Sequence, residues 1–139
     1  MQYLTNDDLK PFIKDVRLSQ LLENDSSIID HAESIAIAEV KDALYSRYDL
    51  ATIFNVANTN NYPQVKRWLA TLILYFLYRR LPDQVVSPSV IRDYDEVREI
   101  LKDISDAKVS INLPHLPSKE DPTKPAHKFR WGSKPTRSN

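Results

Sequence analysis

Apolar residues recur at helical spacing through most of the first 113 residues. The strongest run extends from Tyr62 to Arg80, is apolar nearly all round, and ends before Pro82. Pro63 suits the first turn of a helix, where its missing N–H removes no hydrogen bond. At 1.5 Å per residue, roughly 19 residues span about 28 Å, close to the full width of a compact body of this size. The pattern predicts a central helix that other elements cover on most sides.

Two more long helices are predicted, one over residues 26–47 and one over residues 88–104 with Ser87 as its N-cap. Asp30 and Glu33 near the start of the first helix suit its dipole. The positions expected to face the core from the first helix are Ile28, Ala32, Ile35, Ala36, Glu39, Val40, Ala43 and Leu44. Those expected from the second helix are Val90, Ile91, Tyr94, Val97, Leu101 and Ile104.

The N-terminal stretch predicts short helices. Thr5 followed by Asp8 resembles a capping box, with Asp in place of Glu, and Pro11 interrupts the helix that it starts. Apolar residues then recur at near-helical spacing up to a turn at residues 24–27. Residues 48–61 are predicted to connect two long helices and to end in a polar surface loop.

The pattern changes after the last helix. Residues 109–113 alternate apolar and polar side chains, which predicts a short strand that pairs within the chain, pairs with a neighbour or runs over the surface. From Pro114 onward, prolines recur among Lys, Ser and Thr, a composition that buries too little apolar area to offset chain entropy. We expect an all-α fold: a small helical bundle with a long central apolar helix, a short C-terminal strand and an extended Pro-rich tail. The expected domains are a body at residues 1–113 and an arm at residues 114–139.

Opposite charges separate along the chain, although the formal net charge is zero. Residues 1–113 carry 13 Lys and Arg against 17 Asp and Glu, and residues 114–139 carry 6 against 2. Phosphate recognition usually needs a clustered basic surface, so the acidic body argues against a DNA-binding face. Any contact with nucleic acid is expected in the arm.

Cysteine usage and hydropathy bound the cellular setting. The chain has no cysteine, which excludes disulfides and thiolate chemistry and leaves the compartment open. The polar N-terminal stretch lacks the apolar core of a signal peptide, so export by that route is not expected. The most apolar run, residues 68–78, is much shorter than the roughly 20 residues needed to span a bilayer, and no membrane association is expected.

Catalytic motifs are poorly supported. Gly132 is the only glycine, so no glycine-rich phosphate loop and no G-x-S-x-G elbow can be written. The three histidines, His31, His115 and His127, do not have the spacing of metal ligands on one helix face. An acidic set on the last helix could suggest a divalent ion, but Arg and Lys alternate with it at helical spacing, which favours a solvated, salt-bridged face. That set is Asp93, Asp95, Glu96, Glu99 and Asp103. We expect no catalytic residue, no cofactor and no metal.

Aromatic side chains gather in the last two helices. They could line a ligand pocket, but their helical spacing is more typical of a core. The set is Trp68, Tyr75, Phe76, Tyr78 and Tyr94. Arg79 and Arg80, which follow, complement the C-terminal end of the helix dipole or face an acidic partner.

The arm contains the run Lys128, Phe129, Arg130 and Trp131. Aromatic residues beside cations are typical anchors for a groove on another protein or for a stacked base, and this run is the predicted partner-binding site. The alternative is a tail without a binding role. Extended, the 26 residues of the arm reach up to roughly 80 Å, enough to cross a neighbouring subunit.

An early Leu-x-x-hydrophobic helix and three longer stretches, together covering about residues 5–113, resemble in their order and spacing a family of small helical phage proteins. The three longer stretches are Ala38–Phe54, Tyr62–Arg80 and Ser87–Ile111. The chain is similar to the Mu-type neck proteins and, more distantly, to head-completion adaptors of siphophages, which form the head-to-tail connector ring beneath the portal. Two departures are visible: the family usually has a Gly turn after the last helix where this chain has Asp106-Ala107, and the arm has no clear counterpart.

The resemblance implies a non-enzymatic structural subunit that is made in the host cytoplasm and resides in the virion neck. It implies a homo-oligomeric ring, dodecameric in the particle, which binds the portal protein and other neck or tail proteins and encloses DNA without sequence-specific contacts. Within such a ring, Arg47, Tyr48 and Asp49 are expected to fix a helix junction near a subunit interface. The arm is expected to dock on the portal or on a neighbouring subunit.

A second hypothesis comes from a different functional class. The chain would be a monomeric helical regulator or adaptor that binds a protein or nucleic acid through its basic aromatic tail. This hypothesis predicts a monomer whose binding to nucleic acid depends steeply on salt. An enzyme, the third class, would need a pocket whose residues the sequence does not display.

Overall fold

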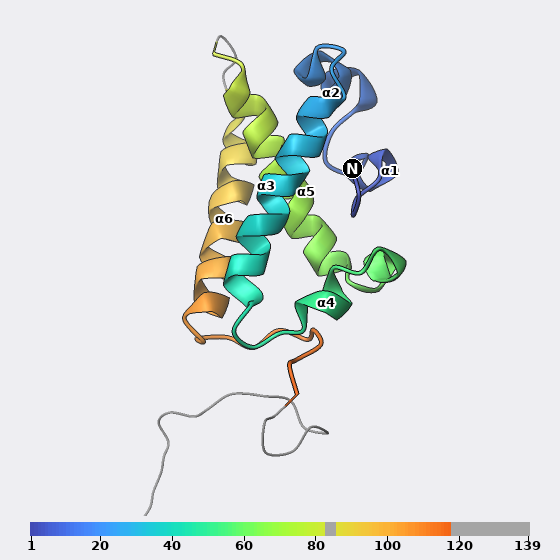
Figure 1. The fold of residues 1–139 in the computed structure, drawn as a ribbon. Helices are drawn as coiled ribbons and strands as arrows, with labels where there is room; N and C mark the ends of the chain where they lie inside the picture. The colour runs from blue at the N-terminus through green and yellow to red at the C-terminus, as the bar shows by residue number, and fades with distance from the viewer. Residues whose placement is uncertain (83–85, 118–139) are drawn as a thin grey trace, which may run out of the picture.

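The computed structural model describes residues 1–82 and 86–117 and is mostly helical (Figure 1). Its elements in chain order are α1 (Asn6–Leu9), α2 (Asp15–Leu22), α3 (Ser27–Leu44), α4 (Leu50–Ile53), the 3-10 helix η1 (Val56–Asn61), α5 (Pro63–Arg80) and α6 (Pro88–Ser105). The long helices α3, α5 and α6 all pack on one another, and α1 and α2 contact α5. The predicted all-α helical bundle with a long central helix is confirmed.

Helix α5 is the centre of the core. Pro63 occupies its first turn, as expected, and α5 contacts α1, α2, α3, α6 and η1. Its buried residues are Val65, Trp68, Leu69, Ala70, Thr71, Leu72, Ile73, Leu74 and Leu77. Burying a large aliphatic side chain contributes about 1.5–3 kcal/mol, so this helix supplies much of the stabilisation of the body. The one polar member, Thr71, donates its hydroxyl to the Arg67 carbonyl at 2.9 Å.

The buried face of α3 differs from the predicted face at its N-terminal half. Ile35 was expected in the core but is 54% exposed, and Ile28 is only half-buried. Ile29 and Glu33 are buried in their place, because the covered stripe runs from residue 29 through 33, 36 and 40 at alternating spacings of four and three. The prediction was correct for Ala32, Ala36, Val40, Ala43 and Leu44.

Helix α6 has one covered face. Val97, Leu101 and Ile104 are buried as predicted, and the charged residues of its opposite face are exposed. Nearer its start, Tyr94 is half-buried and Ile91 is 41% exposed. The predicted stripe is therefore correct in the C-terminal half of α6 and too extensive in its first turns.

The C-terminal end of α6 is closed by a Schellman motif. Lys108 N–H donates to the Asp103 carbonyl at 2.8 Å, and Ala107 N–H donates to the Ile104 carbonyl at 3.0 Å. Ala107 has a φ of 59°, in the left-handed region that glycine adopts most easily. Ala107 therefore adopts the left-handed conformation at the position where a glycine was expected.

The N-terminal helices follow the sequence pattern closely. Thr5 and Asp8 form the predicted capping box of α1, with Thr5 N–H donating to the Asp8 carboxylate at 2.8 Å. Pro11 lies between α1 and α2. Helix α2 ends at Leu22, and the two residues that follow it, Glu23 and Asn24, both have positive φ.

The predicted strand at residues 109–113 is wrong. Among the described residues, the extended pairing is a single antiparallel bridge between His115 and Tyr48, beyond that segment. Two side chains from the α3–α4 connection form hydrogen bonds with the backbone of the segment: Arg47 donates to the Val109 carbonyl, and the Tyr48 hydroxyl accepts the Ile111 N–H. Within the segment, Leu113 N–H donates to the Ile111 carbonyl at 2.8 Å. These groups therefore need no partner strand. The connection itself, predicted as a linker and loop, contains α4 and η1.

Candidate functional site

The predicted interface residues Arg47, Tyr48 and Asp49 come together with the chain that follows α6. We call this contact the Arg47–Asp49 junction. The Arg47 guanidinium donates from Nη2 to the Ile104 carbonyl at 2.7 Å and to the Val109 carbonyl at 3.1 Å. Ile104 lies in the last turn of α6, where carbonyl groups lack helical partners and a cation is favoured. Arg47 therefore ties the end of α6 to the end of α3.

Tyr48 is the buried centre of the junction, with 1% exposure. Its hydroxyl accepts the Ile111 N–H at 2.8 Å, and its ring centroid lies 4.7 Å from that of His115. The backbone on either side of Tyr48 pairs with the same segment: Asp49 N–H donates to the Pro114 carbonyl at 2.8 Å, and Leu116 N–H donates to the Arg47 carbonyl at 3.0 Å. Residues 104–116 are thus held along the α3–α4 connection.

Asp49 performs a second role in the same place. Its carboxylate accepts the Thr52 N–H at 3.3 Å and the Thr52 hydroxyl at 2.7 Å, and so caps α4. The sequence predicted these three residues at a helix junction, and the structure places them at one within the chain. Their position at a subunit interface stays a prediction, and since Tyr48 is buried, any effect of it on a neighbour would pass through the exposed residues around it.

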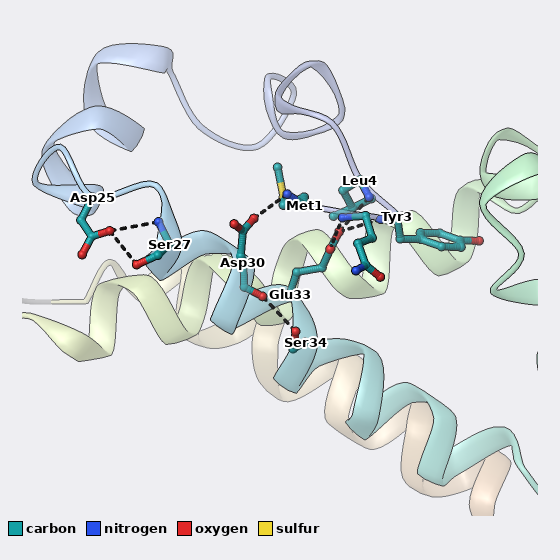
Figure 2. Close-up of polar contacts among 9 residues, drawn as sticks. Met1, Tyr3, Leu4, Asp25, Ser27, Asp30, Glu33 and Ser34 are labelled. Atoms are coloured by element: carbon teal, nitrogen blue, oxygen red, sulfur yellow. Dashed lines mark hydrogen bonds and ion pairs between the residues drawn. The ribbon is translucent and has the colours of Figure 1, made fainter.

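A second anchoring point, which the sequence reasoning missed, is the buried carboxylate of Glu33 (Figure 2). It accepts three backbone N–H groups, from Gln2 at 2.5 Å, Tyr3 at 3.1 Å and Leu4 at 2.8 Å, and Glu33 is 3% exposed. We call this contact the Glu33 site. Three donors satisfy most of the hydrogen-bonding capacity of a carboxylate, which makes its burial tolerable.

A sequence signal for the Glu33 site did exist. Glu33 stands four residues after Ile29 and three before Ala36, inside the apolar stripe of α3. A carboxylate at such a position is rarely buried without partners. Tyr3, beside it, donates its hydroxyl to the Ile53 carbonyl at 3.0 Å. Burial, and then the neighbouring Tyr62, raise the pKa of Tyr3 to about 12, so this side chain stays neutral at physiological pH.

Two open grooves lie along one side of α3, one toward its N-terminal end and one toward its C-terminal end. The α3–α6 groove has a volume of about 470 Å³, with Ala43 and Leu101 at its base and charged residues at its edges. The edge residues are Glu39, Asp42, Arg98, Glu99 and Lys102. The α3–α5 groove, of about 280 Å³, has a mainly apolar lining that includes Ile28, Ile35 and Phe76.

The aromatic residues of α5 and α6 pack the helices together. Trp68 is in the core, as predicted, whereas Tyr75 and Tyr94 are half-buried and stack with centroids 3.6 Å apart and planes at 11°. Arg79 donates to the Tyr75 hydroxyl at 2.9 Å, and Arg80 pairs with Glu23 at 3.1 Å. The partner of Arg80 is thus an acidic residue of this chain, which lies at the end of α2.

Three further predictions concern the arm, metal ions and membranes. Lys128, Phe129, Arg130 and Trp131 lie outside the described residues. Across residues 1–82 and 86–117, no group of three or more His, Asp or Glu side chains is arranged to hold a metal ion. No helix in the described part of the chain has both the length and the hydropathy needed to cross a membrane.

Comparison with known proteins gives one match. The family model described as Bacteriophage Mu, Gp36 matches residues 3–129, which is most of the chain and includes α1 to α6. Neither the curated proteins nor the solved structures contain a match.

Proposed function

The chain belongs to this phage structural-protein family, and on that premise we propose that it is a subunit of the ring-shaped head-to-tail connector between portal and tail. The observation that carries the proposal is the family match over residues 3–129. A connector subunit needs a rigid body with contacts to its neighbours and to the layers above and below. A bundle built on α5, with its N-terminal segment and the chain after α6 both anchored to α3 or its end, fits that need.

The distribution of charge also supports this role. The first 113 residues carry an excess of acidic side chains, 17 against 13 basic ones. Like charge disfavours contact with phosphate, so a channel wall made of such bodies lets DNA pass without binding it. By this proposal the ring is dodecameric, encloses DNA without reading its sequence, and sits in the virion neck. The arm docks on the portal or on a neighbouring subunit.

Cryo-electron microscopy of the phage particles that encode this chain tests the proposal. We expect density for the helical body to repeat in a ring directly below the portal. Particles whose neck lacks this chain, with the protein found only free in infected cells, would contradict it. That result would favour the monomeric regulator, which is tested by measuring the salt dependence of nucleic-acid binding through the Phe129 and Trp131 segment.

The arm is tested separately by truncation. Pro114, His115 and Leu116 belong to the Arg47–Asp49 junction, so a chain that ends after Pro117 keeps the junction and removes only residues 118–139. We expect this truncated chain to fold normally and to lose its stable place in the neck. Unchanged incorporation into particles would remove the arm from the proposal and leave the ring intact.

A further inference from the structure

The α3–α6 groove contains acidic groups without partners. The cations at its edge are engaged, since Arg98 pairs with Glu39, and Lys102 lies 3.8 Å from Asp106. Within the described part of the chain, the carboxylates of Asp42 and Glu99 have no ion pair and no hydrogen bond. Arg98 donates to only one carboxylate oxygen of Glu39, and the other oxygen, Oε2, is buried with no hydrogen-bond partner among the described residues.

We propose that the α3–α6 groove binds the Lys128–Trp131 segment from a second copy of this chain. The inference deepens the proposed function, because it assigns the arm to a neighbouring subunit and names the receiving surface. Lys128 and Arg130 supply cationic donors for the exposed carboxylates of Asp42 and Glu99.

The base of the groove suits the aromatic members of the segment. Ala43 and Leu101, both nearly buried, form an apolar base between charged edges. The volume of about 470 Å³ is within the range of pockets that take sizeable apolar groups. Phe129 and Trp131 provide such groups, and rigid aromatic side chains lose little conformational entropy on binding.

The α3–α5 groove is a poorer match for the same segment. It is apolar, but its charged or titratable lining residues are His31 and Arg80, and its lining contains no carboxylate. A cationic segment would gain no ion pair there, and Arg80 would oppose it. Charge therefore distinguishes the two grooves that lie along α3.

The position of the chain end allows the segment to reach a second copy. The described chain ends at Pro117, at the same end of the bundle as the C-terminal ends of α3 and α6 (Figure 1). The groove residues 98–105 advance only about 12 Å along α6 at 1.5 Å per residue. The ten residues from 118 to 127 can reach up to about 35 Å, well beyond the subunit's own groove. Such a span reaches the groove of a neighbouring subunit as well as that of its own, and engineered disulfides distinguish the two.

Engineered disulfides test the contact directly, because the natural chain has no cysteine and every disulfide found is a designed one. One full-length chain carries Asp42→Cys, a second chain of different mass carries Trp131→Cys, and the two are mixed with oxidised glutathione. We expect a covalent heterodimer, both in concentrated protein and in phage particles assembled from the two chains. Since each chain has one cysteine, only a contact between copies produces it.

Ile35→Cys is the matched control, because Ile35 is exposed on the same helix but lines the other groove. We expect it to link to Trp131→Cys at least about tenfold less, since a disulfide needs Cα atoms within about 7 Å. Equal linking at both positions, or no Asp42→Cys link in either sample, overturns the inference. The inference is also overturned if a chain that carries both Asp42→Cys and Trp131→Cys forms the disulfide only within one chain and not between copies.

Charge reversal provides a second test that needs no disulfide. Asp42→Lys with Glu99→Lys should weaken association of the chain with itself, and Lys128→Glu with Arg130→Glu in the same chain should restore it. Failure of this restoration counts against the groove. The two proposals fail in different ways. A disulfide-linked heterodimer of a chain that is absent from the particle contradicts the connector role. A chain that is present in the neck but forms no Asp42→Cys to Trp131→Cys link contradicts binding in the α3–α6 groove.

Discussion

The Glu33 site and the Arg47–Asp49 junction anchor opposite parts of the chain to α3 by opposite chemistry. At the Glu33 site, one buried anion accepts three N–H groups of the N-terminal segment. At the junction, one half-buried cation donates to two carbonyl groups near the end of α6, and Tyr48 and the backbone share the remaining bonds. The first contact concentrates its energy in one side chain, and the second spreads it over several.

Burial decides how much each charged side chain contributes to the free energy of unfolding. A buried donor that loses its acceptor pays a desolvation cost of about 1–3 kcal/mol, whereas a group near water recovers most of that cost from solvent. Glu33 is 3% exposed, and the Arg47 side chain reaches the surface. The comparison therefore predicts that equal truncations at the two places have unequal effects.

Removal of the buried acceptor should have the largest effect. Glu33→Ala leaves three N–H groups without their partner, and we expect a loss of about 3 kcal/mol in the free energy of unfolding, measured with urea. Glu33→Gln keeps one carbonyl acceptor and should lose about 1–2 kcal/mol. Asp42→Asn, at an exposed position of the same helix, is the control and should change stability by less than about 0.5 kcal/mol. A Glu33→Ala value as small as that of the control would refute the Glu33 site.

The junction should respond less to loss of its charge. We expect Arg47→Ala to lower the free energy of unfolding by about 1–2 kcal/mol, because two charge-assisted hydrogen bonds at a half-exposed position are lost. Arg47→Lys keeps the charge but not the planar fork, and should lose about half as much. Hydrogen exchange at the Asp49 and Leu116 amides checks the location of the effect. Unchanged protection of both amides in Arg47→Ala would show that the junction does not depend on this side chain.

The turn at Ala107, which follows α6, can be made more stable by substitution. A left-handed conformation costs an L-residue about 1–2 kcal/mol, and glycine's extra chain entropy costs about 0.5–1 kcal/mol, so Ala107→Gly should stabilise the protein by about 0.5 kcal/mol. Ala38→Gly, at an exposed position inside α3, should instead destabilise it by about 1 kcal/mol. Thermal unfolding measures both. A loss of stability in Ala107→Gly would mean that the strain at φ 59° is not significant.

The smallest effect concerns pH at the N-terminal side. Burial acts to raise the pKa of Asp8, but hydrogen bonds from Thr5 and Lys66 prevail and hold that pKa below its ordinary value of 3.8. A lowered folded-state pKa stabilises the protein above the unfolded value and stops doing so as the pH falls through the folded value. We therefore expect the stability gap between the natural chain and Asp8→Asn to be constant near neutral pH and to close below 3.8.

Urea titrations at several pH values measure this gap. Asp7→Asn is the control, since the Asp7 side chain is exposed and pairs with Lys10, the exposed residue that directly follows α1. A gap that stays open in strong acid would show that Asp8 acts through packing rather than through its charge.

Local rules predicted the helices well. Pro63, Pro88 and the Thr5–Asp8 capping box marked starts that the structure confirms, because a proline or a cap acts on the backbone of its own turn. The predicted strand failed because residues 109–113 have the right alternation but no partner strand in the described part of the chain. Side chains of Arg47 and Tyr48, more than 50 positions earlier, take their hydrogen bonds.

The sequence by itself determined the helical class, the central place of α5 and the separation of an acidic body from a basic arm, since periodicity, proline position and charge are properties of neighbouring residues. Only the tertiary structure decided that Glu33 is a buried acceptor, that Ile35 faces a groove, and that the carboxylates of Asp42 and Glu99 flank a second groove without an ion-pair partner among the described residues. The reason is physical: whether a charge is buried, paired or available depends on which helices cover it, and that covering joins residues distant in sequence.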